Sequence, residues 1–165
     1  MNVFWSYFLP IVLAGMVIGA VAATLGFRRK SLRPALVAGA GLCLVAAGIW
    51  HGPLGAAGHF SSSVERSARQ ALIDWEMPQV TAHLHQGPLS RQLMLAGPAD
   101  DFQRSELARI MSALPGVGNA GWTDRTGGLP LIAEAALAAC LGFLVGALLA
   151  YLLELHRRHN AQWNW

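Results

Sequence analysis

The sequence predicts an integral membrane protein with three transmembrane α-helices and a small α+β domain between the second and third helices. Of the 165 residues, 54% are hydrophobic and only 13% are charged. A soluble domain usually carries roughly 25% charged residues. The apolar residues gather in three long runs, which suits a hydrocarbon core of ~30 Å. A more polar segment with the turn residues of a folded domain separates the last two runs.

The first predicted span covers residues 3–27 and contains no charged residue. Trp5 and Tyr7 lie at its start, and amphipathic rings of this kind favour the headgroup zone. Pro10 predicts either a kink or a shallow start of the helix. No basic residue precedes the run and three follow it, which argues against a cleaved signal peptide and predicts a translocated N-terminus.

The second predicted span covers residues 34–50, and Gly52-Pro53 predicts its end. The third run, from Leu129 to Leu155, is rich in alanine and leucine. Glu134 and Glu154 lie near its two ends, where a carboxylate can reach water. A carboxylate within a membrane span is also typical of proton relays, but Glu134 alone, without a predicted partner, does not indicate a transporter.

Basic residues predict the orientation of the three spans. Those in the loop 28–33 and in the C-terminal tail are Arg28, Arg29, Lys30, Arg33, Arg157 and Arg158. The middle segment spreads its arginines over a longer stretch and balances them with acidic residues. By the positive-inside rule, the loop and the tail are cytoplasmic, whereas the N-terminus and residues 51–128 lie outside.

The first half of the middle segment predicts a helix followed by two strands. A stripe of apolar residues indicates the helix, with Ser62 and Glu65 at the spacing of a capping box. The stripe consists of Val64, Ala68, Leu72 and Trp75. Residues 79–85 alternate between apolar and polar side chains and predict a strand, and residues 91–96 predict its neighbour.

The second half of the segment predicts another helix and a short last strand. Asp100 is expected to cap this helix, with Gln103 three residues later. The expected buried stripe is Phe102, Leu107, Ile110, Met111 and Leu114. Residues 118–123 predict the strand. The order helix, strand, strand, helix, strand is typical of a small two-layer sandwich.

This order resembles a BON domain, a small module of bacterial envelope proteins, over residues 62–124. The residues that carry the resemblance are Leu93-Met94-Leu95-Ala96-Gly97 and Leu114-Pro115-Gly116-Val117-Gly118-Asn119-Ala120. Gly97, Gly116 and Val117 match the signature positions. The resemblance implies a non-enzymatic module that associates with membranes, phospholipid or other envelope components. The flanking spans depart from the family pattern and put a soluble, lipid-shuttling role in doubt.

Two of the predicted spans carry small residues at a spacing that allows helices to pack closely. Gly15 and Gly19 lie four residues apart in the first span, as do Gly142 and Gly146 in the third. Such pairs let helix backbones approach each other where lipid provides no hydrophobic drive. The pattern predicts packing faces, either within the chain or toward another protein.

Three histidines have spacings that suit a ligand for a cofactor or a metal. His51 follows Ala47 by four residues, a spacing that suits ligation of (bacterio)chlorophyll or haem but also arises by chance at a membrane interface. His83 and His85 share a strand face, where outward polar positions explain them without a metal. No catalytic, metal or nucleic-acid site is predicted, and no cofactor is expected beyond the alternative at His51.

Together these features divide the chain into a transmembrane hairpin (1–58), a BON-like periplasmic domain (59–127) and a third span with a cytoplasmic tail (128–165). The expected function is a non-catalytic accessory, scaffold or assembly subunit of a complex in the bacterial inner membrane. Its expected partners are the lipid bilayer with its phospholipid headgroups and other integral membrane proteins. One alternative is a pigment- or haem-binding component of a photosynthetic or respiratory complex. Another is an independent envelope lipid-binding or stress protein.

Overall fold

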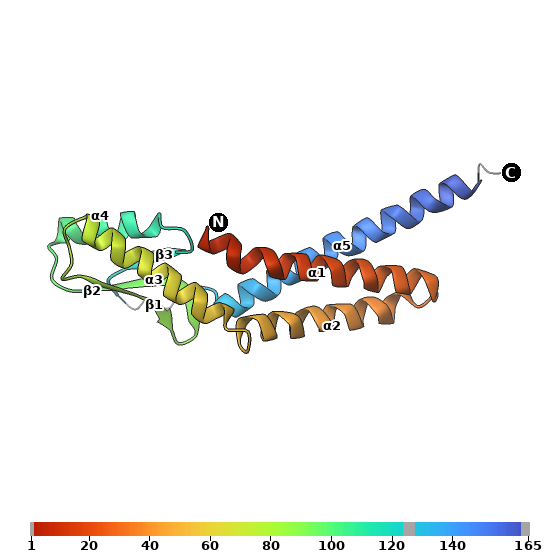
Figure 1. The fold of residues 1–165 in the computed structure, drawn as a ribbon, viewed down its shortest axis with the longest axis horizontal. Helices are drawn as coiled ribbons and strands as arrows, with labels where there is room; N and C mark the ends of the chain where they lie inside the picture. Colours follow the sequence, from red (N-terminus) through yellow and green to blue (C-terminus); the bar gives the residue numbers. More distant parts are fainter. Residues whose placement is uncertain (1, 124–127, 163–165) are drawn as a thin grey trace. The chain divides into compact units, whose positions relative to one another are not determined.

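The computed structural model describes residues 2–123 and 128–162, with side chains described up to residue 160. The chain divides into two compact units. We call Met1–Tyr7 with Leu54–Glu134 the domain unit, and Phe8–Pro53 with Ala135–Trp165 the helical unit. Figure 1 shows the elements in chain order. The expected domain end at residue 127 lies outside the described residues.

Among the described residues, three helices are long and apolar enough to cross a membrane, which agrees with the three predicted spans. They are α1 (Val3–Arg28), α2 (Leu32–His51) and α5 (Leu131–Gln162). The best windows of α1 and α5 have mean hydropathies of 2.3 and 2.4, and that of α2 has 1.8. The second span is therefore the least apolar of the three, as its shorter run suggested.

The ends of α1 and α2 refine the predicted boundaries. Pro10 lies inside α1, which already begins at Val3, so the proline does not mark the start of the helix. The helix α2 ends at His51, as Gly52-Pro53 predicted. At this end the backbone N–H of Gly52 donates to the carbonyl oxygen of Gly48 at 3.0 Å.

Small side chains dominate the core of the helical unit. Cys43 and Ala47 of α2 are buried together with Ile11 of α1 and with Ala139 and Phe143 of α5. Short side chains allow three helix backbones to come close, so van der Waals contact replaces the hydrophobic drive that lipid cannot supply. Phe143 is the large residue that fills the remaining space.

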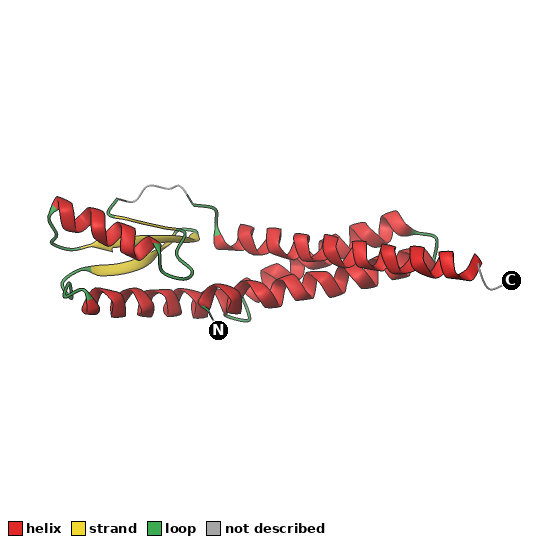
Figure 2. Cartoon of the chain, turned by 90° about the horizontal axis from the view of Figure 1, so that it is seen from above, coloured by secondary structure: helices red, strands yellow, loops and turns green. Residues whose placement is uncertain are grey.

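The domain unit contains two helices and a three-stranded sheet, in the predicted order. Figure 2 shows the helices in red and the strands in yellow. Its elements are α3 (Ala56–Asp74), β1 (Thr81–Gln86), β2 (Leu89–Ala96), α4 (Asp101–Ser112) and β3 (Asn119–Gly121). The strand order is β1-β2-β3, with β1 and β2 antiparallel and β2 and β3 parallel. The connection from β2 to β3 passes through α4, as a parallel pair requires.

The start of α3 differs from the prediction. The helix begins at Ala56, after Gly55 in a left-handed conformation (φ 69°), so the expected boundary between residues 58 and 59 falls inside α3. The predicted capping box is wrong, because Ser62 and Glu65 lie well inside the helix. The Ser62 hydroxyl donates to the carbonyl oxygen of His59 at 3.1 Å instead.

The start of α4 confirms the predicted cap. The Asp100 side chain accepts a hydrogen bond from the backbone N–H of Gln103 at 2.7 Å. In return, the Gln103 side chain accepts from the backbone N–H of Asp100 at 3.0 Å. This reciprocal capping box satisfies two backbone donors that the first turn of a helix leaves without partners.

The core of the domain unit lies between the sheet and the two helices. Leu84 of β1 is paired with Leu93 of β2, which in turn is paired with Ala120 of β3, so all three point to the same face. All three are buried, as are Val64 of α3 and Met111 of α4. Alternation along β1 follows the predicted pattern, since every second residue faces this core.

Helix side chains cap one backbone N–H on each outer strand of the sheet. Glu65 of α3 accepts a hydrogen bond from the N–H of Leu84 in β1 at 3.0 Å. Ser112 of α4 accepts one from the N–H of Ala120 in β3 at 3.0 Å. Both side chains lie on helices, so each helix also contributes a polar contact to an edge of the sheet.

Candidate functional site

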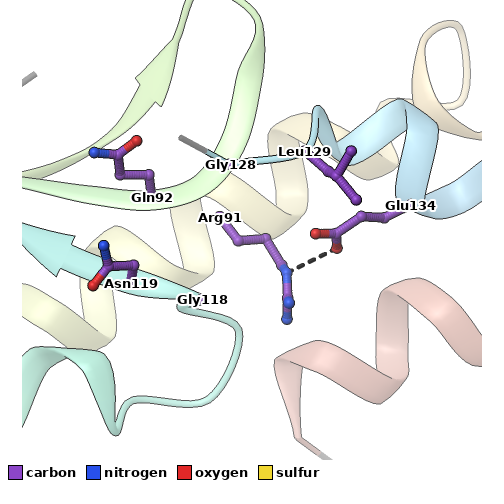
Figure 3. A pocket seen from close by; sticks show the side chains of 7 residues that line it. All are labelled: Arg91, Gln92, Gly118, Asn119, Gly128, Leu129 and Glu134. Atoms are coloured by element: carbon purple, nitrogen blue, oxygen red, sulfur yellow. Dashed lines mark ion pairs between the residues drawn. The ribbon is translucent and has the colours of Figure 1, made fainter. Parts of the chain in front are cut away.

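An ion pair joins the second strand to the first turn of α5. Nε of Arg91 in β2 lies 2.8 Å from Oε2 of Glu134 (Figure 3). Only 26% of the Arg91 side chain and 21% of the Glu134 side chain are exposed. Glu134, which the sequence left without a predicted partner, therefore has its charge balanced by an arginine 43 residues earlier in the chain.

The surroundings of Arg91 hold its guanidinium in place. Its Cζ lies 5.3 Å from the centre of the Phe4 ring, an arrangement that favours a cation through the ring quadrupole. Its Nε is buried and makes no hydrogen bond of acceptable geometry among the described residues. The contact with Glu134 is therefore a charge–charge contact rather than an aligned hydrogen bond.

A pocket of about 270 Å³ opens beside this ion pair. Its lining residues are Arg91, Gln92, Gly118, Asn119, Gly128, Leu129 and Glu134 (Figure 3). Arg91 and Gln92 leave the strand in opposite directions, as neighbours on a strand do. The backbone N–H of Gly118 donates to the carbonyl oxygen of Arg91 at 2.7 Å, which fixes the loop before β3. The two charged residues that line this pocket are paired with each other, so their role is to link β2 to the start of α5.

A second feature of the domain unit is an exposed apolar patch, which we call the aromatic patch. It comprises Trp75, Met77, Phe102 and Ile110, which line a groove of about 340 Å³ together with the buried Leu107 and with Gln103 and Glu106. Trp75 is 58% exposed and Phe102 is 75% exposed. The prediction that Phe102 belongs to a buried stripe is therefore wrong, and Trp75 does not share the burial of Val64, Ala68 and Leu72 in its apolar stripe.

The two aromatic residues are exposed for different reasons. Trp75 follows the last residue of α3, and Glu76 after it has a left-handed backbone (φ 57°), so the helix and its buried face end before Trp75. Phe102 and the buried Leu107 are five residues apart, which places them about 140° apart around a helix. The predicted buried stripe therefore combined residues from two different faces of α4.

The four predicted packing glycines meet at one crossing in the helical unit. A Cβ added to Gly15 would collide with the backbone of Ala139, and one added to Gly19 with the backbone of Phe143. The glycines of α5 face the backbone of α1 in the same way: Gly142 faces Val12, and Gly146 faces Met16. Residues later in α1 meet residues later in α5, so the two helices run in the same direction at this crossing.

The predicted ligand His51 is the last residue of α2 and is partly buried. Ala47, the small residue one turn earlier, is only 1% exposed and belongs to the core of the helical unit. The space over Ala47 that a macrocycle would need is therefore filled by protein atoms.

The strand histidines lie apart from any cluster of ligands. Nδ1 of His83 lies 3.8 Å from Oε2 of Glu65, and the His83 side chain is 61% exposed. Nδ1 of His85 lies 3.3 Å from the carbonyl oxygen of Pro88. Within residues 2–123 and 128–162, no three His, Cys, Asp or Glu side chains are grouped so that they would hold a metal ion.

The glycines of the BON-like signatures lie where a side chain would not fit. Gly97 has φ 140°, and an added Cβ would lie 2.7 Å from the carbonyl oxygen of Gln79. Gly116 has φ 97°, and its Cβ would lie 2.9 Å from a methyl group of Val64. Val117 is buried beside it. All three positions hold the turns that end β2 and α4.

No protein-family model matches the chain, and neither the curated proteins nor the solved structures compared with it give a match.

Proposed function

We propose that this chain is a non-catalytic accessory, scaffold or assembly subunit of a protein complex in the bacterial inner membrane. The observation that carries the proposal is the aromatic patch. Large exposed apolar surfaces on folded domains mark interaction sites, and tryptophan is enriched among the residues that dominate binding energy. Trp75 and Phe102 supply such a surface on a domain whose own core is already filled by other residues.

The proposed membrane placement rests on the helical unit. Large apolar residues of α1 remain exposed at every fourth position, namely Leu9, Leu13, Val17, Val21 and Leu25. In water such a stripe would be unfavourable, whereas lipid solvates it. Together with the positive-inside rule, this supports an outside N-terminus, a periplasmic domain unit and a cytoplasmic C-terminus.

We also propose that residues 62–124 form a BON-like module. Support comes from the order of helices and strands and from the positive φ angles at the two signature glycines. Gly97 and Gly116 both have positive φ, which favours glycine over any other residue. The module would then serve as the binding part of the subunit, with the spans as its anchor.

A site-specific photocrosslinker tests the subunit proposal. Incorporated at Phe102 in cells, it should give a discrete protein adduct, and Trp75→Ser should reduce the yield of that adduct. The matched control position is Gln70, which is exposed on α3 of the same unit but outside the aromatic patch. If Phe102 yields only lipid adducts, the independent lipid-binding role replaces the subunit proposal. An adduct of equal yield from Gln70 also contradicts it.

The pigment- or haem-binding proposal at His51 has a separate test. The purified protein would show a Soret or near-infrared absorption band that disappears in His51→Ala. The burial of Ala47 does not support this proposal, because the macrocycle would have to displace α1 or α5 from the core. An absent or unchanged band eliminates it.

A further inference from the structure

A groove runs between α1 and α5, from the glycine crossing toward the C-terminal ends of both helices. Its volume is about 500 Å³. The apolar walls include Met16, Val17 and Ala20 of α1 and Leu149, Ala150 and Leu153 of α5. Val17 is 63% exposed and Leu153 is 70% exposed, so the groove is open along its length.

The length of the groove corresponds to one leaflet of a bilayer. It extends from Met16, beside the glycine crossing, to Arg28 at the end of α1. Twelve helical residues rise by ~18 Å at ~1.5 Å each. Half of a hydrocarbon core of ~30 Å is ~15 Å, so the apolar walls match the depth of one layer of acyl chains.

The open end of the groove is positively charged. Arg28 and Arg157 line it together with Glu154, the one acidic residue of the lining. The carboxylate of Glu154 is engaged most closely by Arg158, whose Nε lies 2.9 Å from Oε1, while Nε of Arg157 lies 3.9 Å from Oε2. Arg29, Lys30 and Arg33 follow in the adjoining loop and the start of α2. Positive charge therefore exceeds negative charge at this end.

We propose that this groove binds one anionic phospholipid, with an acyl chain along the apolar walls and the headgroup phosphate near Arg28 and Arg157. Basic pockets between membrane helices suit anionic headgroups through charge attraction. Arginine is also well matched to phosphate oxygens, because its planar donors pair with two of them at once. The inference rests on the membrane placement of the spans and is independent of the aromatic patch.

Lipid titration of the purified full-length chain tests the headgroup part of the proposal. In mild detergent, native mass spectrometry should show saturable binding of one dioleoyl-phosphatidylglycerol, and weaker binding of dioleoyl-phosphatidylcholine. Replacing both Arg28 and Arg157 with glutamine should weaken phosphatidylglycerol binding about thirtyfold. The control Arg29→Gln with Lys30→Gln removes the same charge outside the groove and should weaken it by less than about threefold.

A second pair of variants tests the apolar part. Val17→Trp should fill the groove and reduce the bound lipid, whereas Val21→Trp, at an exposed position of α1 outside the lining, should leave it unchanged. Equal binding of the two lipids overturns the proposal. Equal losses from the two charge pairs, or from the two tryptophan variants, also overturn it, since binding would then reflect total charge or the helix surface in general.

Discussion

The ion pairs Arg91–Glu134 and Arg109–Glu106 have similar distances but different surroundings. The first has an Nε–Oε2 distance of 2.8 Å, and the second has 2.7 Å between Nη2 and Oε2. The hydrogen bond with Glu106 raises the pKa of the Arg109 guanidinium above its usual value. Arg109 is 72% exposed, however, so water screens its pair, whereas Arg91 and Glu134 are largely shielded.

Removing Arg91 should therefore matter more than removing Arg109. Arg91→Met leaves the Glu134 carboxylate partly buried without its partner, which should destabilise the protein by about 1–2 kcal/mol. Arg109→Met should have little effect. Thermal unfolding of the purified full-length chain in mild detergent measures both. Glu134→Leu added to Arg91→Met should restore part of the loss, and equal effects of the two arginine substitutions would contradict the assignment.

The backbone at Gly97 leads to a second prediction at the scale of one residue. Gly97→Ala should destabilise the domain unit by about 1–3 kcal/mol, because φ is 140° and the added Cβ would meet Gln79 and Val80. Gly121→Ala, in β3, is the control, since nothing lies within 4 Å of its Cβ position. The same thermal measurement compares them, and a Gly97→Ala variant as stable as the control would refute the prediction.

At the scale of an element, the crossing of α1 and α5 depends on direct backbone contact. Gly15, Gly19, Gly142 and Gly146 each face the backbone of the opposite helix rather than its side chains. Even one methyl group at these positions forces the helices apart. By contrast, Gly41 and Gly48 of α2 have open space where a Cβ would lie.

This contrast predicts that the same substitution, glycine to alanine, changes stability differently at the crossing and in α2. Gly146→Ala should destabilise the chain by about 1–3 kcal/mol, because the methyl group overlaps the backbone of Met16. Gly48→Ala should leave stability unchanged or raise it by up to about 1 kcal/mol, because alanine favours a helix more than glycine does. Midpoints of thermal unfolding in mild detergent test the pair. Equal shifts in the same direction would show that the crossing does not form.

Local patterns predicted the elements better than their contacts. The apolar runs predicted the spans, and alternation along Val80, Ala82 and Leu84 predicted β1, because both signals lie within a few consecutive residues. The pairing of Arg91 with Glu134 was not predictable in this way, since the two residues are 43 positions apart and are brought together only by the tertiary fold. Glu65 matched a capping box locally, but its carboxylate instead accepts a hydrogen bond from the N–H of Leu84, which lies in a strand 19 residues further along the chain.

At the scale of the whole molecule, the proposed topology has a direct test. In a background in which the free Cys43 and Cys140 are changed to alanine, a single cysteine replaces Ser105 in α4 or Asn160 near the end of α5. A membrane-impermeant maleimide should label Ser105→Cys in intact cells with a permeable outer membrane. It should label Asn160→Cys only after the inner membrane is broken. The reverse pattern would invert the topology and contradict a periplasmic domain.

The hydrogen bonds at the two edges of the sheet limit how a partner can attach. Outer strands normally offer unpaired N–H groups on which a strand of another chain can align. Glu65 and Ser112 each occupy one such group, on Leu84 and Ala120 respectively. Each of these bonds removes one pairing position from its edge, which disfavours strand addition there, both in fibrils and by a binding partner. Association would then proceed through side chains on the helices, which makes recognition depend on the shape of a surface rather than on backbone pairing.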